Sequence, residues 1–103
     1  MEMNQYLEVF IEESKEHLQT CSEQLLVLEK NPEDLSIVNE IFRSAHTLKG
    51  MSATMGYEDL ANLTHKMENV LDAIRNSKIA LSPELFDVIF LAVDDLEAMV
   101  MSI

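Results

Sequence analysis

One histidine, in a stretch of small and polar residues, has the surroundings of a reactive group. His46 lies in Ser44-Ala45-His46-Thr47-Leu48-Lys49-Gly50, with Arg43 one helical turn before it and Lys49 one turn after it. Because its unperturbed pKa is close to neutral pH, an exposed imidazole can serve as a nucleophile, a proton acceptor or a metal ligand. The two cations would balance the charge of an approaching phosphate group. His46 is therefore a candidate phosphate acceptor.

The residues around His46 follow the period of an amphipathic helix, which we expect over residues 34–55. At about 100° per residue, one sector holds the side chains expected in the core: Ile37, Val38, Ile41, Ala45, Leu48, Ser52 and Met55. His46 points about 130° away from the centre of that sector. The outer face also carries Arg43, Lys49, Gly50 and Ala53. A histidine that only packs would lie inside the apolar sector, so this position favours a role in chemistry.

Gly50 and Ala53 leave little side-chain bulk beside His46. A glycine in the middle of a helix costs about 0.5–1 kcal/mol relative to alanine, so its presence requires a reason. We interpret Gly50 as steric access for a second surface. Arg43 and Ala53, on the same face, are the further candidates for contact with a partner.

Three further helices are expected, at about residues 3–29, 57–76 and 83–103. The turn signals between helices are Asn31-Pro32-Glu33-Asp34, Met55-Gly56, Asn76-Ser77-Lys78 and Ser82-Pro83-Glu84. The chain has only 2 glycines and 2 prolines, which fits a few long elements. Four helices with short connections predict an all-α fold, an antiparallel up-down-up-down four-helix bundle.

Apolar residues spaced alternately by three and four positions are expected to form the core. In the first helix these are Leu7, Ile11, Ser14, Leu18, Cys21, Leu25 and Leu28. The fourth helix has the same spacing at Leu85, Ile89, Ala92, Leu96, Met99 and Ile103. In the third helix, the predicted core stripe is Leu60, Leu63, Thr64, Met67, Val70, Leu71 and Ile74. Five apolar residues of the last helix fall outside its stripe: Phe86, Phe90, Leu91, Val93 and Val100. They predict an interface, or a further C-terminal helix beyond residue 103.

Two residues of the third helix are expected to lie near His46. The tight turn at Gly56 makes the second and third helices antiparallel neighbours. At a rise of about 1.5 Å per residue, His65 and Glu68 then lie at heights similar to that of His46. They share one flank of their helix. A Glu68 carboxylate that accepts the Nδ1 proton of His46 would leave Nε2 as the free nucleophile.

The charge balance limits the classes of partner. With 19 acidic and 7 basic residues, the net charge is −12, which disfavours nucleic acids and anionic membranes. The single cysteine, Cys21, excludes an internal disulfide and fits a reducing compartment. No apolar run approaches the roughly 20 residues of a membrane span, and the N-terminus lacks the features of a signal peptide. We expect a cytoplasmic domain whose partners carry positive patches.

Over essentially its whole length, the chain resembles a known family of signalling domains. The residues that carry the resemblance are Ala45-His46-Thr47-Leu48-Lys49-Gly50 with Ala53, Thr54-Met55-Gly56-Tyr57, His65-x-x-Glu68-Asn69, and Met1, Asn4, Tyr6, Phe10, Glu13 and Leu18. The family is that of histidine phosphotransfer (HPt) domains, and the likeness is to those at the N-terminus of chemotaxis histidine kinases of the CheA type.

This resemblance implies a path for a phosphoryl group. His46 would accept the group from ATP through a separate kinase domain, acting in trans within a dimer. The phosphohistidine would then donate it to an aspartate on receiver domains of response regulators, of the CheY and CheB types. Carried over by position, Glu68 is the hydrogen-bond partner of His46. Lys49 and His65 support the site, whereas Arg43 rests on its spacing alone.

The chain is expected to take part in this chemistry without binding ATP itself. Its two glycines, Gly50 and Gly56, cannot form the glycine-rich loop that holds nucleotide phosphates. No separate acidic cluster for Mg²⁺ stands out from the general acidity. We therefore expect no cofactor or metal in this domain, with ATP and Mg²⁺ supplied by partner domains. Residues 1–103 would form one phosphotransfer domain, the N-terminal piece of a longer histidine protein kinase.

Two other functions stay open from the residues alone. His46, His65 and Glu68 offer three possible ligands for zinc. Alternatively, the chain is an acidic helical interaction module that docks a basic partner and does no chemistry.

Overall fold

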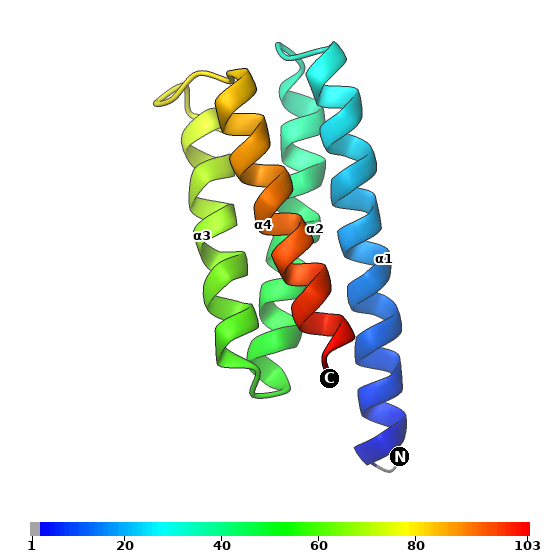
Figure 1. The fold of residues 1–103 in the computed structure, drawn as a ribbon. Coiled ribbons are helices and arrows are strands. Elements are labelled where there is room, and N and C mark those ends of the chain that lie inside the picture. The colour runs from blue at the N-terminus through cyan, green and yellow to red at the C-terminus, as the bar shows by residue number, and fades with distance from the viewer. Residues whose placement is uncertain (1–2) are drawn as a thin grey trace.

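Four long helices joined by short turns form residues 3–103, the part of the chain described by this computed structural model. They are α1 (Met3–Lys30), α2 (Leu35–Thr54), α3 (Glu58–Arg75) and α4 (Pro83–Met101). The helices run alternately up and down (Figure 1), and each packs against two neighbours in the ring α1–α2–α3–α4. The predicted all-α, up-down-up-down bundle is confirmed. Met1, one of the residues behind the family resemblance, lies outside the described residues.

Side-chain caps determine where α2 and α4 begin. The Asp34 carboxylate accepts a 3.0 Å hydrogen bond from the backbone N–H of Ser36, which satisfies a free donor at the start of α2. At α4, Oγ of Ser82 accepts a 3.1 Å hydrogen bond from the N–H of Leu85. Pro83 occupies the first turn, where a missing N–H leaves no hydrogen bond unmade. Both capping residues lie in the segments that the sequence marks as turn signals.

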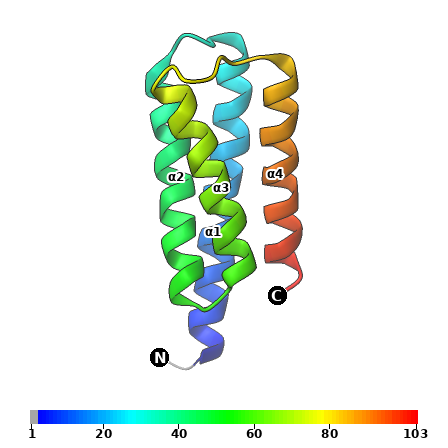
Figure 2. The same ribbon diagram turned by 90° about the vertical axis from the view of Figure 1, so that its left-hand side faces the viewer.

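The turn between α2 and α3 makes these helices neighbours. Gly56 has a φ of 82°, in the left-handed region that glycine enters without steric cost. Its N–H donates to the carbonyl of Ala53 at 3.1 Å, and the N–H of Tyr57 donates to the carbonyl of Ser52 at 2.9 Å. This pair of bonds is the Schellman motif. The chain therefore reverses within a few residues, and α3 returns antiparallel beside α2 (Figure 2).

In α1, α2 and α3, the core follows the predicted stripes with few changes. Every core residue predicted in α2 is buried except Met55, which is partly exposed. Phe10 is buried as well, and its ring stacks on that of Tyr57 with centroids 5.4 Å apart. Four predicted core residues are only partly buried: Leu7, Ile11, Leu63 and Val70. The Phe10–Tyr57 stack ties α1 to the α2–α3 turn.

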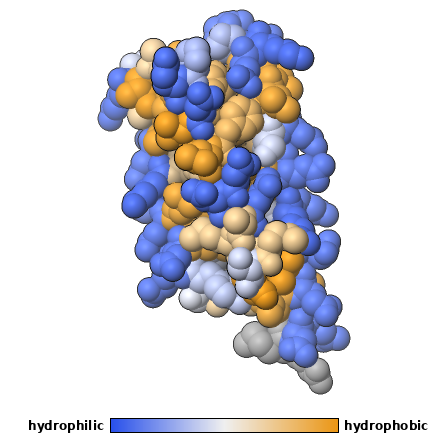
Figure 3. All heavy atoms as spheres, viewed as in Figure 1, coloured by the Kyte–Doolittle hydropathy of each residue, from blue (hydrophilic) through white to orange (hydrophobic). Residues whose placement is uncertain are grey.

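The predicted core stripe of α4 was partly wrong. The buried residues of α4 are Phe86, Ile89, Val93, Leu96 and Val100, whereas Leu85, Ala92 and Met99 are partly buried and Ile103 is exposed. Both sets have the same alternating spacing, so the period alone does not select between them in a helix this apolar. Of the five residues assigned to an outer surface, only Leu91 is largely exposed, at 61%. On the face with α4 in front, hydrophobic side chains lie among hydrophilic ones (Figure 3).

The bundle is long and narrow, measuring 45 × 21 × 20 Å. The N-terminal turns of α1 extend past the other three helices (Figure 1). Within residues 3–103, no helix is both long and apolar enough to cross a lipid bilayer. In a bundle this slender, a reactive side chain on an outer helix face is open to a second protein.

The end of α3 provides a test of the turn geometry. Ser77 has a φ of 59°, and this left-handed conformation costs a residue with a side chain about 1–2 kcal/mol. We expect Ser77→Gly to raise the free energy of unfolding by about 0.5–1 kcal/mol, because glycine removes the strain but adds entropy to the unfolded chain. Urea denaturation followed by circular dichroism measures the change. Ser102→Gly, at a residue with a φ of −88°, is the control and should not stabilise; a less stable Ser77→Gly variant would contradict the strain.

Candidate functional site

The imidazole of His46 lies against α3 while most of its surface stays open to solvent. Its side chain is 63% exposed, and Nδ1 lies 3.1 Å from Oε2 of Glu68. This is the contact predicted from the heights of the two residues on antiparallel helices. When Nδ1 carries the proton and its N–H donates a hydrogen bond to the carboxylate, Nε2 keeps a free lone pair. The ring then has the tautomer of a nucleophile.

The sequence predicted that Glu68 lies on a flank of α3 together with His65. In the structure Glu68 is buried, whereas His65 is exposed. Glu68 is 5% exposed, and Nζ of Lys49 lies 2.9 Å from its Oε1. The Lys49 ammonium places a positive charge directly against this carboxylate oxygen. We call His46, Lys49 and Glu68 the polar cluster.

The polar cluster keeps Glu68 ionised. Burial of the Glu68 carboxyl raises its pKa, but the contacts with Lys49 and His46 outweigh this effect and hold the pKa below its usual value. A charged carboxylate is the form that accepts the strongest hydrogen bond from the Nδ1–H group. The electrostatics therefore favour the tautomer with Nε2 free.

Two residues that the sequence did not assign to the site extend it on the other side of His46 along α2. The ring of Phe42, one turn before His46, is nearly parallel to the imidazole, with centroids 6.1 Å apart and planes 8° apart. The guanidinium of Arg75, on α3, lies 4.1 Å from the centroid of the Phe42 ring. The i, i+4 spacing of Phe42 and His46 was the available signal. Nothing in the sequence pairs Arg75 with either of them.

The remaining predicted residues lie on outer faces and do not join the polar cluster. Arg43, Gly50 and Ala53 are exposed on α2. His65 is exposed on α3, and over residues 3–103 no hydrogen bond or ion pair connects it to the polar cluster. The supporting role of His65 stays a prediction.

A shallow, mostly apolar hollow of about 480 Å³ lies beside Gly50, between α1 and α2. Its lining is Tyr6, Val9, Phe10, Glu13, Thr47, Gly50, Met51, Thr54 and Met55. A methyl group placed on Gly50 would meet no atom within 4 Å. The missing side chain is therefore not required by packing inside this domain, and the surface next to Thr47, the residue after His46, is open to a partner.

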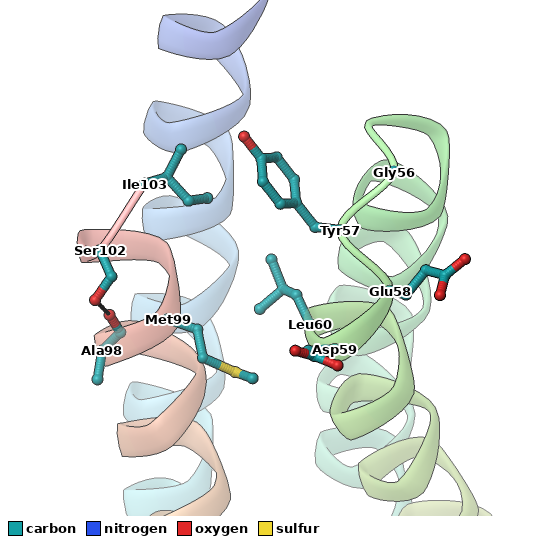
Figure 4. A pocket seen from close by; sticks show the side chains of 9 residues that line it. All are labelled: Gly56, Tyr57, Glu58, Asp59, Leu60, Ala98, Met99, Ser102 and Ile103. Atoms are coloured by element: carbon teal, nitrogen blue, oxygen red, sulfur yellow. Dashed lines mark hydrogen bonds between the residues drawn. The ribbon is translucent and has the colours of Figure 1, made fainter.

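A second pocket, of about 640 Å³, lies at one end of the bundle between the start of α3 and the end of α4 (Figure 4). Leu60 and Met99 point toward each other across it, whereas Glu58 points away. None of the residues predicted to do chemistry lines this pocket. It is separate from the polar cluster and has no part in the site.

The zinc alternative lacks a set of ligands. In the described part of the chain, no group of three or more His, Cys, Asp or Glu side chains is placed to hold a metal ion. His46 and Glu68 are in contact, but Glu68 is already paired with Lys49. A cation would have to displace the Lys49 ammonium to reach that carboxylate.

A four-helix bundle that holds one exposed histidine by a buried carboxylate has the architecture of a histidine phosphotransfer domain. The profile of the family described as "Hpt domain" matches residues 5–100. The chain belongs to this family.

Its relatives are chemotaxis proteins. The chain is 67% identical over 103 residues to chemotaxis protein CheA of Bacillus subtilis (strain 168), covering 100% of this chain and 15% of that protein. It is 56% identical over 97 residues to chemotaxis protein CheA of Listeria monocytogenes, covering 94% of this chain and 16% of that protein. The chain thus spans 15–16% of the length of these two relatives.

Solved structures have the same bundle. The CheA phosphotransferase domain from Thermotoga maritima superposes with a TM-score of 0.95 at 49% identity, covering 99% of this chain and 97% of that one. The phosphorylated P1 domain of CheA3, in complex with CheY6 from R. sphaeroides, superposes with a TM-score of 0.89 at 23% identity, covering 97% and 78%. At that identity, the second likeness establishes the fold alone.

The pKa of Glu68 tests the electrostatics of the polar cluster. We expect NMR titration of the Glu68 carboxyl carbon to give a pKa below about 4.3, the usual value for glutamate. Because folding lowers this pKa, the contribution of the ionised Glu68 carboxylate to the free energy of unfolding is complete at pH values above the unfolded-state pKa. It is lost as the pH falls through the folded-state value.

Variants identify the cause of this shift. Lys49→Met removes the ammonium and leaves the carboxylate buried, so the pKa of Glu68 should rise above that of the wild type. Lys66→Met removes an exposed lysine of α3 and should leave the pKa unchanged. An unchanged pKa in Lys49→Met would show that the ion pair does not set the charge of Glu68.

Proposed function

We propose that this domain accepts a phosphoryl group on Nε2 of His46 and passes it to an aspartate of a response-regulator receiver domain. The observation that carries the proposal is the 3.1 Å contact between Nδ1 of His46 and the buried carboxylate of Glu68. This contact favours a free Nε2 on a side chain that is 63% exposed. A nucleophile that is oriented and also open suits reactions with a second protein.

In the accepting step, Nε2 attacks the γ-phosphorus of ATP held by a kinase domain. The Nε2–P bond forms as the bond from phosphorus to the ADP oxygen breaks. The Nδ1 proton stays hydrogen-bonded to Glu68, whose charge stabilises the positive ring. Lys49 offsets the charge of the phosphoryl oxygens. In the donating step, an aspartate oxygen attacks the phosphorus, the Nε2–P bond breaks and the imidazole returns to its neutral form.

The names of the relatives support an inference about the kinds of partner. Two similar proteins are named chemotaxis protein CheA, and a neighbour in fold is a P1 domain in complex with CheY6. We infer that the partners here are the kinase catalytic domain of the same chain or of a dimeric partner chain, and receivers of the CheY and CheB types. The hollow beside Gly50 is the surface that best fits a docked receiver, because it is open and is lined by Thr47, the residue after His46.

The reaction requires little beyond positioning from this domain. Phosphoryl transfer depends mainly on alignment and charge neutralisation, which a histidine, a lysine and a carboxylate supply. ATP and Mg²⁺ would come with the partner domains. On this proposal the chain is one domain, the N-terminal part of a longer cytoplasmic histidine kinase, and the kinase activity belongs to the rest of that protein.

Replacing the acceptor tests the proposal directly. His46→Gln should abolish incorporation of acid-labile phosphate from labelled ATP in the presence of a CheA kinase domain, because within residues 3–103 no other imidazole contacts a buried acid. His17→Gln, at a partly exposed histidine of α1, should keep full incorporation. Label that persists in His46→Gln would disprove phosphotransfer. A wild-type domain that takes up no label but still binds the receiver would favour the interaction module.

The orienting acid has its own test. Glu68→Gln keeps the shape of the side chain but removes the charge, so the rate of His46 phosphorylation should fall at least about tenfold while the bundle stays folded. Glu97→Gln, at an exposed glutamate of α4, should phosphorylate at the wild-type rate. Rapid-quench kinetics with a saturating kinase domain measures both rates; equal rates would remove Glu68 from the mechanism.

A substitution at Gly50 distinguishes an effect on stability from an effect on partner docking. Gly50→Ala should raise the free energy of unfolding by about 0.5–1 kcal/mol, because the added methyl group meets nothing within 4 Å. Transfer to the receiver should become slower, because the methyl group projects into the docking surface. Stopped-flow transfer and urea denaturation give the two quantities. A variant that is stabilised and transfers at the wild-type rate would show that Gly50 does not serve docking.

A further inference from the structure

The ring of His46 has one hydrogen bond and a second, apolar neighbour. The Glu68 contact fixes where Nδ1 lies, but a single hydrogen bond leaves the tilt of a ring that is 63% exposed free to vary. Phe42 lies parallel to the imidazole, within 8°, at a centroid distance of 6.1 Å. This is inside the range of about 4.5–7 Å over which aromatic rings interact. Phe42 is thus a second neighbour of the ring, in addition to Glu68.

Phe42 is itself held from the neighbouring helix. Arg75 reaches across from α3 and places its guanidinium 4.1 Å from the centroid of the Phe42 ring, a cation–π contact. The guanidinium is fixed by the carboxylate of Asp72 at 2.6 Å and by the side-chain oxygen of Asn39 at 3.5 Å. Asn39 lies on α2 and Asp72 on α3. The Arg75 side chain is therefore held by both helices.

We propose that Phe42 is a positioning residue for His46, and that Arg75 acts through Phe42 by holding its ring flat beside the imidazole. The inference rests on the proposed phosphotransfer function and assigns it two residues outside the polar cluster. Arg75 is not a phosphate ligand in this arrangement, because its charge is directed to Phe42 and Asp72. Its effect on the reaction passes through the orientation of the His46 ring, and hence of the Nε2 lone pair.

The test compares Phe42→Leu, Phe42→Tyr and Arg75→Gln with a matched control. Phe90→Leu makes the same change at another partly buried phenylalanine, on α4 and away from the site. The first measurement is the rate of His46 phosphorylation by phosphoramidate, a small donor that needs no docking surface. The second is the NMR order parameter of the His46 ring, which reports its mobility on the picosecond-to-nanosecond timescale. Circular dichroism confirms that each variant is folded.

Phe42→Leu should slow phosphorylation about 5- to 20-fold, since small misalignments of a nucleophile are costly, and should lower the order parameter of the His46 ring. Phe42→Tyr keeps the ring and should restore both. Arg75→Gln should give a smaller slowing, which should vanish in the Phe42→Leu background because Arg75 then has no ring to hold. Phe90→Leu should match the wild type in both measurements.

Two outcomes would overturn the inference. One is an unchanged ring order parameter and rate in Phe42→Leu. The other is equal slowing by Arg75→Gln in both backgrounds, which would mean that Arg75 acts without Phe42. Failure of the proposed function is distinguishable from both outcomes, because it appears separately as label retained in His46→Gln. A wild-type rate in Phe42→Leu beside an inactive His46→Gln would leave phosphotransfer intact and remove only the positioning role.

Discussion

A carboxylate held out of water between a lysine and a histidine is the interaction on which this site depends. Burying the charge of Glu68 in the α2–α3 interface costs several kcal/mol of hydration, an order of magnitude typical of buried ions. The Lys49 ammonium at 2.9 Å and the His46 ring at 3.1 Å offset that cost. Because the carboxylate needs both partners, local stability and orientation of the imidazole come from one set of contacts.

The polar cluster forms only because two helices keep one register. The Schellman turn at Gly56 closes α2 and starts α3 within a few residues, and the stack of Phe10 on Tyr57 fastens this turn to α1. Because this turn is short, His46 on α2 and Glu68 on α3 lie at similar heights. The buried carboxylate and the imidazole are therefore in contact.

The His46 ring has close contacts on one side and open surface on another. Glu68 defines the position of one ring nitrogen, and Phe42 lies parallel to the ring one turn away. In the other direction along α2, Gly50 carries no side chain and opens onto a hollow between α1 and α2. The close contacts of His46 are therefore with Glu68 and Phe42, while the hollow lies on the side of Gly50. This division leaves an oriented imidazole that is open to solvent.

The sequence by itself determined the four helices, their caps and the outward direction of His46, because these follow from local periodicity and turn chemistry. It also predicted Glu68 as the partner of Nδ1, since heights along antiparallel helices can be counted. Only the tertiary structure decided that Glu68 is buried, which face of α4 packs inward, and that Arg75 lies on Phe42. The period of a helix gives the direction of a side chain about its own axis. How far that side chain is from a neighbouring helix, and what covers it, depends on how the helices pack.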